Sequence, residues 1–600
     1  MDQWVKFTIK IFYNGGNIMK NIDILNKINS PEDLKKLDIE ELKKLSNEIR
    51  NTLIERVSVT GGHMGSNLGF VEATIAMHYV FNSPKDKFVF DVSHQSYTHK
   101  ILTGRKEGFT VPEKYYSLSG YTTPTESEHD FFKIGHTSTS ISLATGLAKG
   151  RDLKGENENI IAVIGDGSMS GGEALEGLNN AAMLNSNMII IFNDNEMSIA
   201  ENQGGMYENF KLLRETNGKS DNNFFKSFGL DYKYVEDGND IEKLIEVFNE
   251  VKDIDHPIVI HVHTLKGNGL NWAIEDKESG HWAIAKALSN IKPTENYNEI
   301  TNNFILEKIK NDKKVVAVTA GTPGVTGMTK EFRKLAGKQF VDVGIAEEHA
   351  VAFISGLSKN GAKPVFEVMS SFIQRTYDQL NHDLAMNSNP ATILVYGAGI
   401  GGGDCTHNGM YDVSMLSSIP NLVCLAPTTK EQYLAMLDWS IEQNNHPVVI
   451  RVPDEVISVG VEEEFDENMI YKMKIRKYGS KIAILALGNA YKLGEEVVNL
   501  IEEKSGINAT LIDPVNYANI DKEGLEALEE NHSIVVTIEN GVLDGGFGQK
   551  VASYFAKDNT MKVISFGGEK SFNDLLPADE IAKKNHMTKE QIVEDIFLEL

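Results

Sequence analysis

Two polar residues stand just after short apolar runs, and both carry side chains that bind divalent metal ions. Asp166 follows the run Ile160-Ile-Ala-Val-Ile-Gly, and Asn195 follows the run Met188-Ile-Ile-Ile-Phe-Asn-Asp. A short, continuous apolar run is typical of a strand that is buried on both faces. Ligands of open α/β sheets bind at the carboxyl ends of such strands. Because Mg²⁺ prefers carboxylate and carbonyl oxygens, this pair predicts a magnesium site.

The segment between these two strands predicts a phosphate-binding helix. Residues 173–184 are rich in small residues, and the chain enters them through Ser168-Met-Ser-Gly-Gly. The free amides at a helix N-terminus attract phosphate, so metal and helix together indicate a bound diphosphate. A lone Gly-Asp-Gly is usually only a turn, but the spacing and the flanking strands argue against that reading here.

Composition limits the possible partners of the chain. Its 600 residues, 41% of them hydrophobic, suggest three or four domains with sizeable cores. The net charge of −26 argues against nucleic acid or an anionic membrane surface as a main partner.

Cys405 and Cys424 are too few for a disulfide framework, and neither lies in a metal-ligand spacing. With no bilayer-length apolar run and no signal peptide, we expect a cytoplasmic protein. Residues 1–18 lack periodicity, so translation is expected to start at Met19.

Strand-like runs alternate with helical segments along the chain, which is the pattern of doubly wound α/β domains. The expected strands are 88–92, 160–164, 188–192 and 258–262, then 315–319, 340–343, 364–368, 393–396, 422–425 and 448–452, and finally 482–487, 510–512, 534–538 and 563–566. Charged, turn-rich sequence at 276–303 predicts a linker, and acidic sequence at 462–468 predicts a second boundary. We therefore expect three doubly wound α/β domains with mostly parallel sheets, at 19–292, 298–462 and 470–600.

Five longer motifs support a family resemblance. They are Gly62-His-Met-Gly-Ser-Asn-Leu-Gly, Phe90-Asp-Val-Ser-His-Gln-Ser-Tyr-Thr-His-Lys, Glu126-Ser-Glu-His-Asp, Gly135-His-Thr-Ser-Thr-Ser and Val343-Gly-Ile-Ala-Glu-Glu-His-Ala. They resemble 1-deoxy-D-xylulose-5-phosphate synthases more than the related transketolases. The resemblance implies a transketolase-like homodimer that uses thiamine diphosphate and Mg²⁺. It further implies condensation of pyruvate with glyceraldehyde 3-phosphate, loss of carbon dioxide, and a product used for isoprenoid and thiamine synthesis.

The resemblance also implies which residues hold the cofactor. Asp166, the Asn195 side chain and the Met197 backbone carbonyl would bind Mg²⁺. Glu347 would hydrogen-bond the pyrimidine ring of thiamine diphosphate, and Phe372 would pack on that ring. The further implied cofactor contacts are His63, Gly135, His136, Ser138, Gly165, Gly167 and Ser168. Ser138 and Ser140 fit a purely structural role equally well.

Four histidines match active-site positions of the family, and two arginines remain near the acceptor site. The histidines are His63, His94, His281 and His407. An imidazole titrates near neutrality, so these residues suit proton transfer in the carboligation alongside the catalytic Glu347. Arg375 and Arg451 are the candidates for binding the phosphate of the acceptor.

The acceptor half of the predicted site departs from the family pattern. Gly397 and Asp454 stand where the family carries arginines, Met369 replaces a tyrosine, and Asp404 is out of register. Each charge-assisted hydrogen bond is worth roughly 1.5 to 3 kcal/mol, so losing both arginines weakens phosphate binding by about 10²- to 10⁴-fold. A different aldehyde acceptor, or a transketolase-type two-carbon transfer, therefore stays open. A cofactor-binding scaffold without turnover is the alternative from another class.

Overall fold

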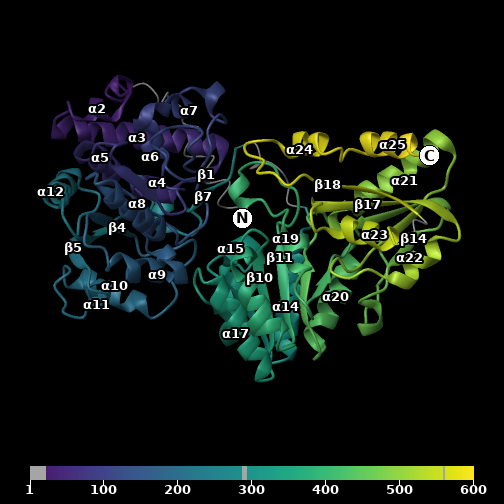
Figure 1. Ribbon diagram of the computed structural model, residues 1–600. Helices are drawn as coiled ribbons and strands as arrows, with labels where there is room; N and C mark the ends of the chain where they lie inside the picture. Colours follow the sequence, from purple (N-terminus) through teal and green to yellow (C-terminus); the bar gives the residue numbers. More distant parts are fainter. Residues whose placement is uncertain (1–21, 287–293, 558–560) are drawn as a thin grey trace. The chain divides into compact units, whose positions relative to one another are not determined.

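Three main sheets with helices on their faces make up the computed structural model, which describes residues 22–286, 294–557 and 561–600 (Figure 1). The chain divides into a first unit, Met1–Pro293, and a second unit, Thr294–Leu600. The predicted start at Met19 lies outside the described residues. Within the described ranges, no helix combines the length and apolarity that crossing a bilayer requires.

The first unit contains a five-stranded parallel sheet. Its strands, in spatial order, are β2 (Lys87–Phe90), β3 (Ile160–Gly165), β4 (Met188–Asp194), β6 (Pro257–His263) and β5 (Asp231–Val235). Successive side chains of a strand point to opposite faces. Ile161 and Val163 therefore join one core cluster, whereas Ile160 and Ala162 join another. Burial on both faces explains why these strands are continuous apolar runs.

Helices cover both faces of this sheet. One core cluster includes residues of α3 (Ile39–Thr60), α5 (Val71–Val80) and α12 (Ile241–Val251). The other includes residues of α8 (Ser140–Lys154), α9 (Gly172–Ala181), α10 (Met206–Glu215) and α11 (Phe224–Ser227). Shorter helices are α2 (Pro31–Leu34), α4 (Gly65–Gly69), α6 (Tyr97–Lys100), α7 (Glu107–Thr110) and α13 (Asn271–Glu275). The predicted helix at 173–184 is α9.

The second unit begins with a six-stranded parallel sheet. In spatial order it contains β12 (Val423–Leu425), β13 (Pro447–Arg451), β11 (Ala391–Tyr396), β10 (Lys363–Met369), β8 (Val315–Thr319) and β9 (Phe340–Asp342). Its two core clusters draw on α14 (Tyr297–Asn311), α16 (Lys330–Ala336) and α20 (Lys430–Glu442), and on α17 (Glu347–Lys359) and α19 (Asp412–Leu416). Short helices are α15 (Pro323–Thr326) and α18 (Tyr377–Gln379).

A five-stranded sheet ends the second unit. Its order is β14 (Lys474–Lys477), β16 (Thr510–Asp513), β15 (Lys481–Leu487), β17 (His532–Val542) and β18 (Lys562–Gly568), and only β14 is antiparallel. Helices α21 (Tyr491–Ser505) and α25 (Lys589–Leu598) lie on one face, and α22 (Lys522–Leu528) and α23 (Phe547–Phe555) lie on the other (Figure 1). Helix α24 (Ala578–Lys584) precedes α25.

The predicted strands are all present, but the predicted linker is wrong at both ends. Within 276–303, β7 (Trp282–Ala283) pairs with β1 (Gly62–His63), and α14 starts at Tyr297. Strands β1, β5, β7 and β14 were not predicted. Each predicted domain contains one main sheet, and one core cluster contains residues from both sheets of the second unit. The predicted boundary between the second and third domains, at 462–470, therefore stays a prediction.

Candidate active site

Asp166 and Asn195 follow the carboxyl ends of two adjacent parallel strands. Strand β3 pairs with β4, with Gly165 opposite Asn193, so the residues that follow the strands meet at one edge. Asp166 is only 1% exposed. Its Oδ2 accepts hydrogen bonds from the Met197 amide at 2.9 Å and from Asn202 Nδ2 at 2.7 Å. The peptide of Met197 thus lies against the Asp166 carboxylate.

The electrostatics of this strand edge suit a divalent cation. Burial raises the pKa of Asp166 to about 7, and the negative charge of Asp194 adds to the rise. The Oδ1 atom of Asn195 is buried and has no hydrogen-bond partner among the described residues. A buried acceptor without a partner costs about 1–3 kcal/mol. A metal ion here would bind the unpaired Asn195 carbonyl oxygen and offset the buried negative charge of Asp166. These oxygen ligands therefore fit Mg²⁺.

Two lysines that the sequence analysis did not single out lie at the same strand edge. Lys266 Nζ donates to the Ser198 carbonyl at 2.5 Å, and Lys277 Nζ donates to the Asn195 carbonyl at 3.0 Å. Burial lowers the pKa of Lys266 to about 8, although the charge of Asp166 opposes that shift. These cations are placed to offset the charge of a diphosphate. A single lysine in a loop has no periodic signal, so only the structure reveals them.

The loop at 135–140, which contains the predicted cofactor contacts Gly135, His136 and Ser138, is held by residues that follow two strands. The buried carboxylate of Asp91, which follows β2, accepts hydrogen bonds from the amides of Ser138 and Ser140 at 2.8 and 2.9 Å. Ser138 Oγ donates to the Ser168 carbonyl at 2.8 Å. The Ser138 hydroxyl is therefore engaged within the loop, which favours the structural role for this residue. Gly167 lies so close to Ser198 that a Cβ would be 2.7 Å from its Oγ.

Three of the four predicted histidines form a cluster in the first unit. The ring centroids of His63 and His94 are 4.9 Å apart, those of His63 and His281 are 5.4 Å apart, and those of His94 and His281 are 5.6 Å apart. Burial lowers the pKa of His281 well below its ordinary value, and the charges of Lys266 and the other two histidines add to that effect. We call these three residues the histidine cluster.

Backbone contacts hold the cluster in place. Asn67 Nδ2 donates to the His63 carbonyl at 2.8 Å and to the His94 carbonyl at 2.7 Å, joining the two segments. Val92 and Ser93, just before His94, have φ angles of 56° and 64°. A β-branched residue rarely adopts positive φ, and such strain is concentrated at functional sites. The chain thus holds His94 at an energetic cost.

The second unit holds the remaining predicted residues. Glu347 is the first residue of α17, is 3% exposed, and has one oxygen, Oε2, without a hydrogen bond among the described residues. Burial raises its pKa to about 7, against the opposing charge of Arg375, whose Nη1 lies 3.9 Å away. Phe372 and His407 make an edge-to-face ring contact at 5.6 Å.

Gly397 and Asp454, which depart from the family pattern, are exposed, but neighbouring side chains contact both of them. A Cβ at Gly397 would lie 2.6 Å from the Met369 Cε, so the methionine occupies the space of any side chain at 397. Asp454 Oδ2 accepts a hydrogen bond from Asn489 Nδ2 at 2.7 Å. Arg451 is buried and its Nε donates to Asp412 Oδ2 at 2.7 Å. Only its Nη1 lacks a partner among the described residues.

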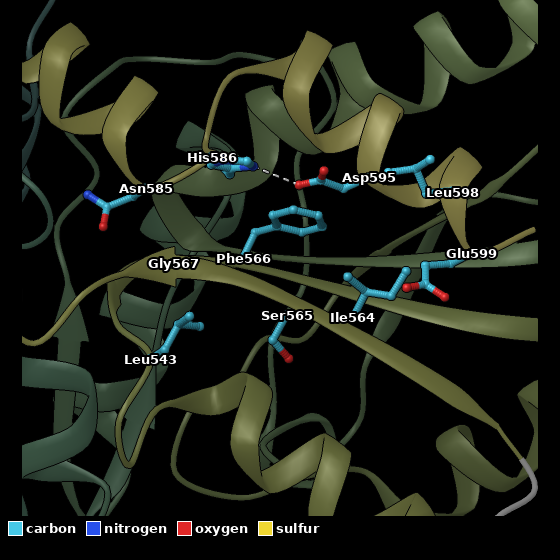
Figure 2. A pocket seen from close by; sticks show the side chains of 10 residues that line it. All are labelled: Leu543, Ile564, Ser565, Phe566, Gly567, Asn585, His586, Asp595, Leu598 and Glu599. Atoms are coloured by element: carbon cyan, nitrogen blue, oxygen red, sulfur yellow. Dashed lines mark hydrogen bonds and ion pairs between the residues drawn. The ribbon is translucent and has the colours of Figure 1, made fainter.

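A cavity of about 340 Å³ lies elsewhere in the second unit, between β18 and α25 (Figure 2). His586 Nδ1 and Asp595 Oδ2 are 3.0 Å apart at its rim, and Phe566 and Leu598 line it. None of the predicted site residues lines this cavity.

Three segments of the chain match family models. Residues 25–221 and 213–264 match the model described as 1-deoxy-D-xylulose-5-phosphate synthase. Residues 295–457 match the transketolase pyrimidine-binding domain, and residues 471–592 match the transketolase C-terminal domain. The fold and these matches define a transketolase-type α/β enzyme and confirm the predicted fold class.

Curated relatives show the particular family. The 1-deoxy-D-xylulose-5-phosphate synthase of Clostridium beijerinckii is 38% identical over 592 residues, covering 92% of this chain and 95% of that protein. The synthase of Clostridium botulinum strain Eklund 17B is 40% identical, covering 91% and 95%. A solved transketolase from Campylobacter jejuni covers 94% of this chain and 100% of its own, with 15% identity and a TM-score of 0.44. The chain belongs to the 1-deoxy-D-xylulose-5-phosphate synthase family.

Proposed function

We propose that the protein is a thiamine diphosphate- and Mg²⁺-dependent transferase that makes 1-deoxy-D-xylulose 5-phosphate from pyruvate and glyceraldehyde 3-phosphate. Family membership supports the reaction. The observation that carries the metal and cofactor assignment is the buried pair at the strand tips, Asp166 and Asn195, with one carbonyl oxygen still unpaired. We further propose that it acts as a cytoplasmic homodimer whose product serves isoprenoid and thiamine synthesis.

The residues of the first unit would hold the diphosphate end of the cofactor. Asp166, Asn195 and the Met197 carbonyl are assigned to Mg²⁺, and Lys266 and Lys277 would offset the phosphate charge. The further proposed contacts are His63, Gly135, His136, Gly165, Gly167, Ser168 and, through its backbone, Ser138. The Asp91 carboxylate keeps the 135–140 loop in one conformation through two backbone amides. Restraint of the loop by these hydrogen bonds would lower the entropic cost of binding.

The residues of the second unit would bind the pyrimidine end. When bound, thiamine diphosphate supplies a nucleophilic carbon that accepts the two-carbon unit of pyruvate. Glu347 would bind the pyrimidine ring nitrogen as a carboxylate, and its burial keeps water from competing for that hydrogen bond. Phe372 would pack against the ring. Arg375 and Arg451 stay candidates for the acceptor's phosphate, although Asp412 already holds most of the Arg451 guanidinium.

The proton steps are assigned to histidines. In the overall reaction the carboxyl carbon of pyruvate leaves as carbon dioxide, a carbon–carbon bond forms to the aldehyde carbon, and the new alkoxide takes up one proton. Burial lowers the pKa of His281 well below its ordinary value, so this residue would stay neutral at pH 7 and would serve as a hydrogen-bond partner rather than as a charged proton donor. His63 and His94, beside it, would deliver the proton to the alkoxide, and His407 would act next to Phe372.

A labelled-pyruvate assay tests this proposal. The full chain with thiamine diphosphate and Mg²⁺ is expected to release carbon dioxide from pyruvate when glyceraldehyde 3-phosphate is added, with equal formation of the pentulose phosphate. No release with any aldehyde would refute the reaction. Tight cofactor binding without release would favour the scaffold without turnover.

One feature of the second unit favours a second candidate function, in which pyruvate is the donor and a different aldehyde is the acceptor. Met369 fills the space next to Gly397, and Asp454 places a carboxylate at the end of β13, in the half of the site assigned to the acceptor phosphate. A carboxylate repels a phosphate. The same assay with unphosphorylated aldehydes distinguishes the two candidates, because the second predicts a higher kcat/KM without the phosphate.

A further inference from the structure

The cavity between β18 and α25 has a largely apolar floor (Figure 2). Its volume of about 340 Å³ lies at the lower end of the range of roughly 300–1,000 Å³ that is typical of small-molecule sites. Leu543, Ile564 and Phe566 supply apolar lining, and Leu598 also lines the cavity although it is 79% exposed. Covering these side chains removes apolar surface from water, so the floor favours a ligand with an apolar body.

Hydrogen bonds and close packing fix the walls of this cavity. Asn585, in the connection between α24 and α25, is buried, and its Oδ1 accepts a hydrogen bond from the Glu569 amide at 2.8 Å. Its Nδ2 donates to the Ile581 carbonyl at 2.7 Å, which ties α24 to the end of β18. A Cβ at Gly567 would lie 2.8 Å from Leu543 Cδ2, so Leu543 packs directly on the strand backbone. The cavity is therefore formed by packed elements with defined positions.

The rim of the cavity carries the negative end of a helix. Helix α25 has no basic residue in its last turn, and a helix C-terminus has free carbonyls and a partial negative charge. Asp595 lies in that turn, Glu599 follows it, and both line the cavity. Figure 2 shows the Asp595 carboxylate on the same side of β18 as the Phe566 ring. The net charge of −26 also attracts cations to the protein, so the rim favours a positively charged group.

The basic partners of the two carboxylates are weak competitors for such a ligand. His586 Nδ1 lies 3.0 Å from Asp595 Oδ2, and Lys562 forms an ion pair with Glu599. The side chains of these partners are 61% and 48% exposed. Solvent-exposed ion pairs contribute little free energy. A cation that also covers the apolar floor therefore has an advantage over both partners.

We propose that the cavity binds a small organic cation, in which a primary ammonium group meets Asp595 and Glu599 and an aromatic or branched alkyl body lies on Phe566. The ammonium group donates charge-assisted hydrogen bonds, each worth about 10- to 100-fold in affinity. The two carboxylates repel an anion, and a neutral alcohol lacks the charge that the rim favours. The residues assigned to the cofactor and the substrates do not line this cavity, so the inference goes beyond the proposed function and does not depend on it.

Three probes of matched shape provide the first test. Full-length protein saturated with thiamine diphosphate and Mg²⁺ is titrated in a calorimeter with 2-phenylethylammonium, 2-phenylethanol or 3-phenylpropanoate. The ammonium is expected to bind saturably with a Kd of about 1 mM or lower, which suits a ligand of this size. The alcohol is expected to bind at least about tenfold more weakly, and the carboxylate is expected not to bind measurably. Equal affinity for the ammonium and the alcohol, or no saturable binding of the ammonium, would overturn the inference.

Variants at the rim provide the second test. Asp595→Asn is expected to weaken binding of 2-phenylethylammonium by about tenfold or more. The matched control is Glu594→Gln, which changes an exposed carboxylate one position away that does not line the cavity, and its affinity is expected to stay within about twofold of the wild type. His586 has a φ of 55°, which glycine adopts readily. His586→Gly frees Asp595 of its partner and is expected to bind the ammonium at least as tightly as the wild type.

Hydrogen exchange locates the bound probe. With 2-phenylethylammonium, amides of β18 and α25 are expected to exchange more slowly, and 2-phenylethanol at the same concentration is expected to have a smaller effect. Protection of other segments alone, or equal affinities of Asp595→Asn and Glu594→Gln, would contradict the assignment of the ammonium to this cavity. Because these measurements need no turnover, a failure of the proposed reaction leaves them interpretable.

Discussion

Replacing Glu347 by glutamine is expected to stabilise the cofactor-free protein at alkaline pH while abolishing turnover. Burial raises the pKa of Glu347 from 4.5 to about 7. The folded state therefore binds the proton more tightly than the unfolded state does, so stability falls as the pH rises from about 4.5 through about 7. A rise of about 2.5 units corresponds to about 3 kcal/mol that the charged carboxylate costs the fold at pH 8.

Glutamine keeps the shape of the side chain and removes the charge. At pH 8, Glu347→Gln is expected to unfold with a free energy about 3 kcal/mol higher than that of the wild type, and at pH 5 the gap is expected to shrink to about 1 kcal/mol or less. The local opening free energy is read from hydrogen exchange of the α17 amides by mass spectrometry, comparing variants at the same pH. Turnover is expected to fall by about 10²-fold or more, because the amide cannot act as an anionic hydrogen-bond acceptor.

The neighbouring Glu348 provides the matched control. It lies on the same turn of α17 and is only partly buried, so Glu348→Gln is expected to change stability by less than about 0.5 kcal/mol. Equal behaviour of the two variants at pH 8, or a Glu347→Gln protein that keeps more than a tenth of wild-type turnover, would refute the reasoning.

Three further predictions concern other parts of the molecule. Asp166→Asn is expected to weaken Mg²⁺-dependent thiamine diphosphate binding by about 10²-fold or more in calorimetry, since it removes the anionic metal ligand; unchanged affinity would contradict the metal assignment. Gly65→Ala places a Cβ 2.8 Å from a paired backbone carbonyl and is expected to lower turnover and the thermal midpoint, whereas Gly150→Ala, with nothing within 4 Å, is expected to be neutral or slightly stabilising. Arg451→Met leaves Asp412 buried without its ion-pair partner and is expected to lower stability by about 3–5 kcal/mol in urea titration; unchanged stability with a raised acceptor KM would instead identify Arg451 as a substrate ligand.

The central strands could be predicted from the sequence because burial on both faces requires a continuous apolar run. Strand β4, for example, is a continuous apolar run that ends in polar residues. Two of the missed strands, β5 and β14, lie at sheet edges and carry charged residues. Edge strands face solvent and are kept polar, so their sequences resemble loops.

Single site residues were predictable only where a motif marked them. Asp166 and Asn195 follow strands at a recognisable spacing, and the structure places them at adjacent strand tips. Lys266 and Lys277 belong to no periodic pattern, and their contacts come from segments far away in the chain. His281 was assigned from the family resemblance, yet its segment was mistaken for a linker, because pairing between residues more than two hundred positions apart leaves no local trace.

The pairing of β1 with β7 also has a consequence for synthesis of the chain. Every strand of the first sheet is complete once residue 263 has been made, but His63 meets His281 only after the chain has passed Ala283. A nascent or truncated chain that ends before Asn271 would contain every strand of this sheet but would lack His281 and the pairing of β1 with β7. Contacts of such long sequence separation are slow to form, so the histidine cluster is expected to assemble after the sheet.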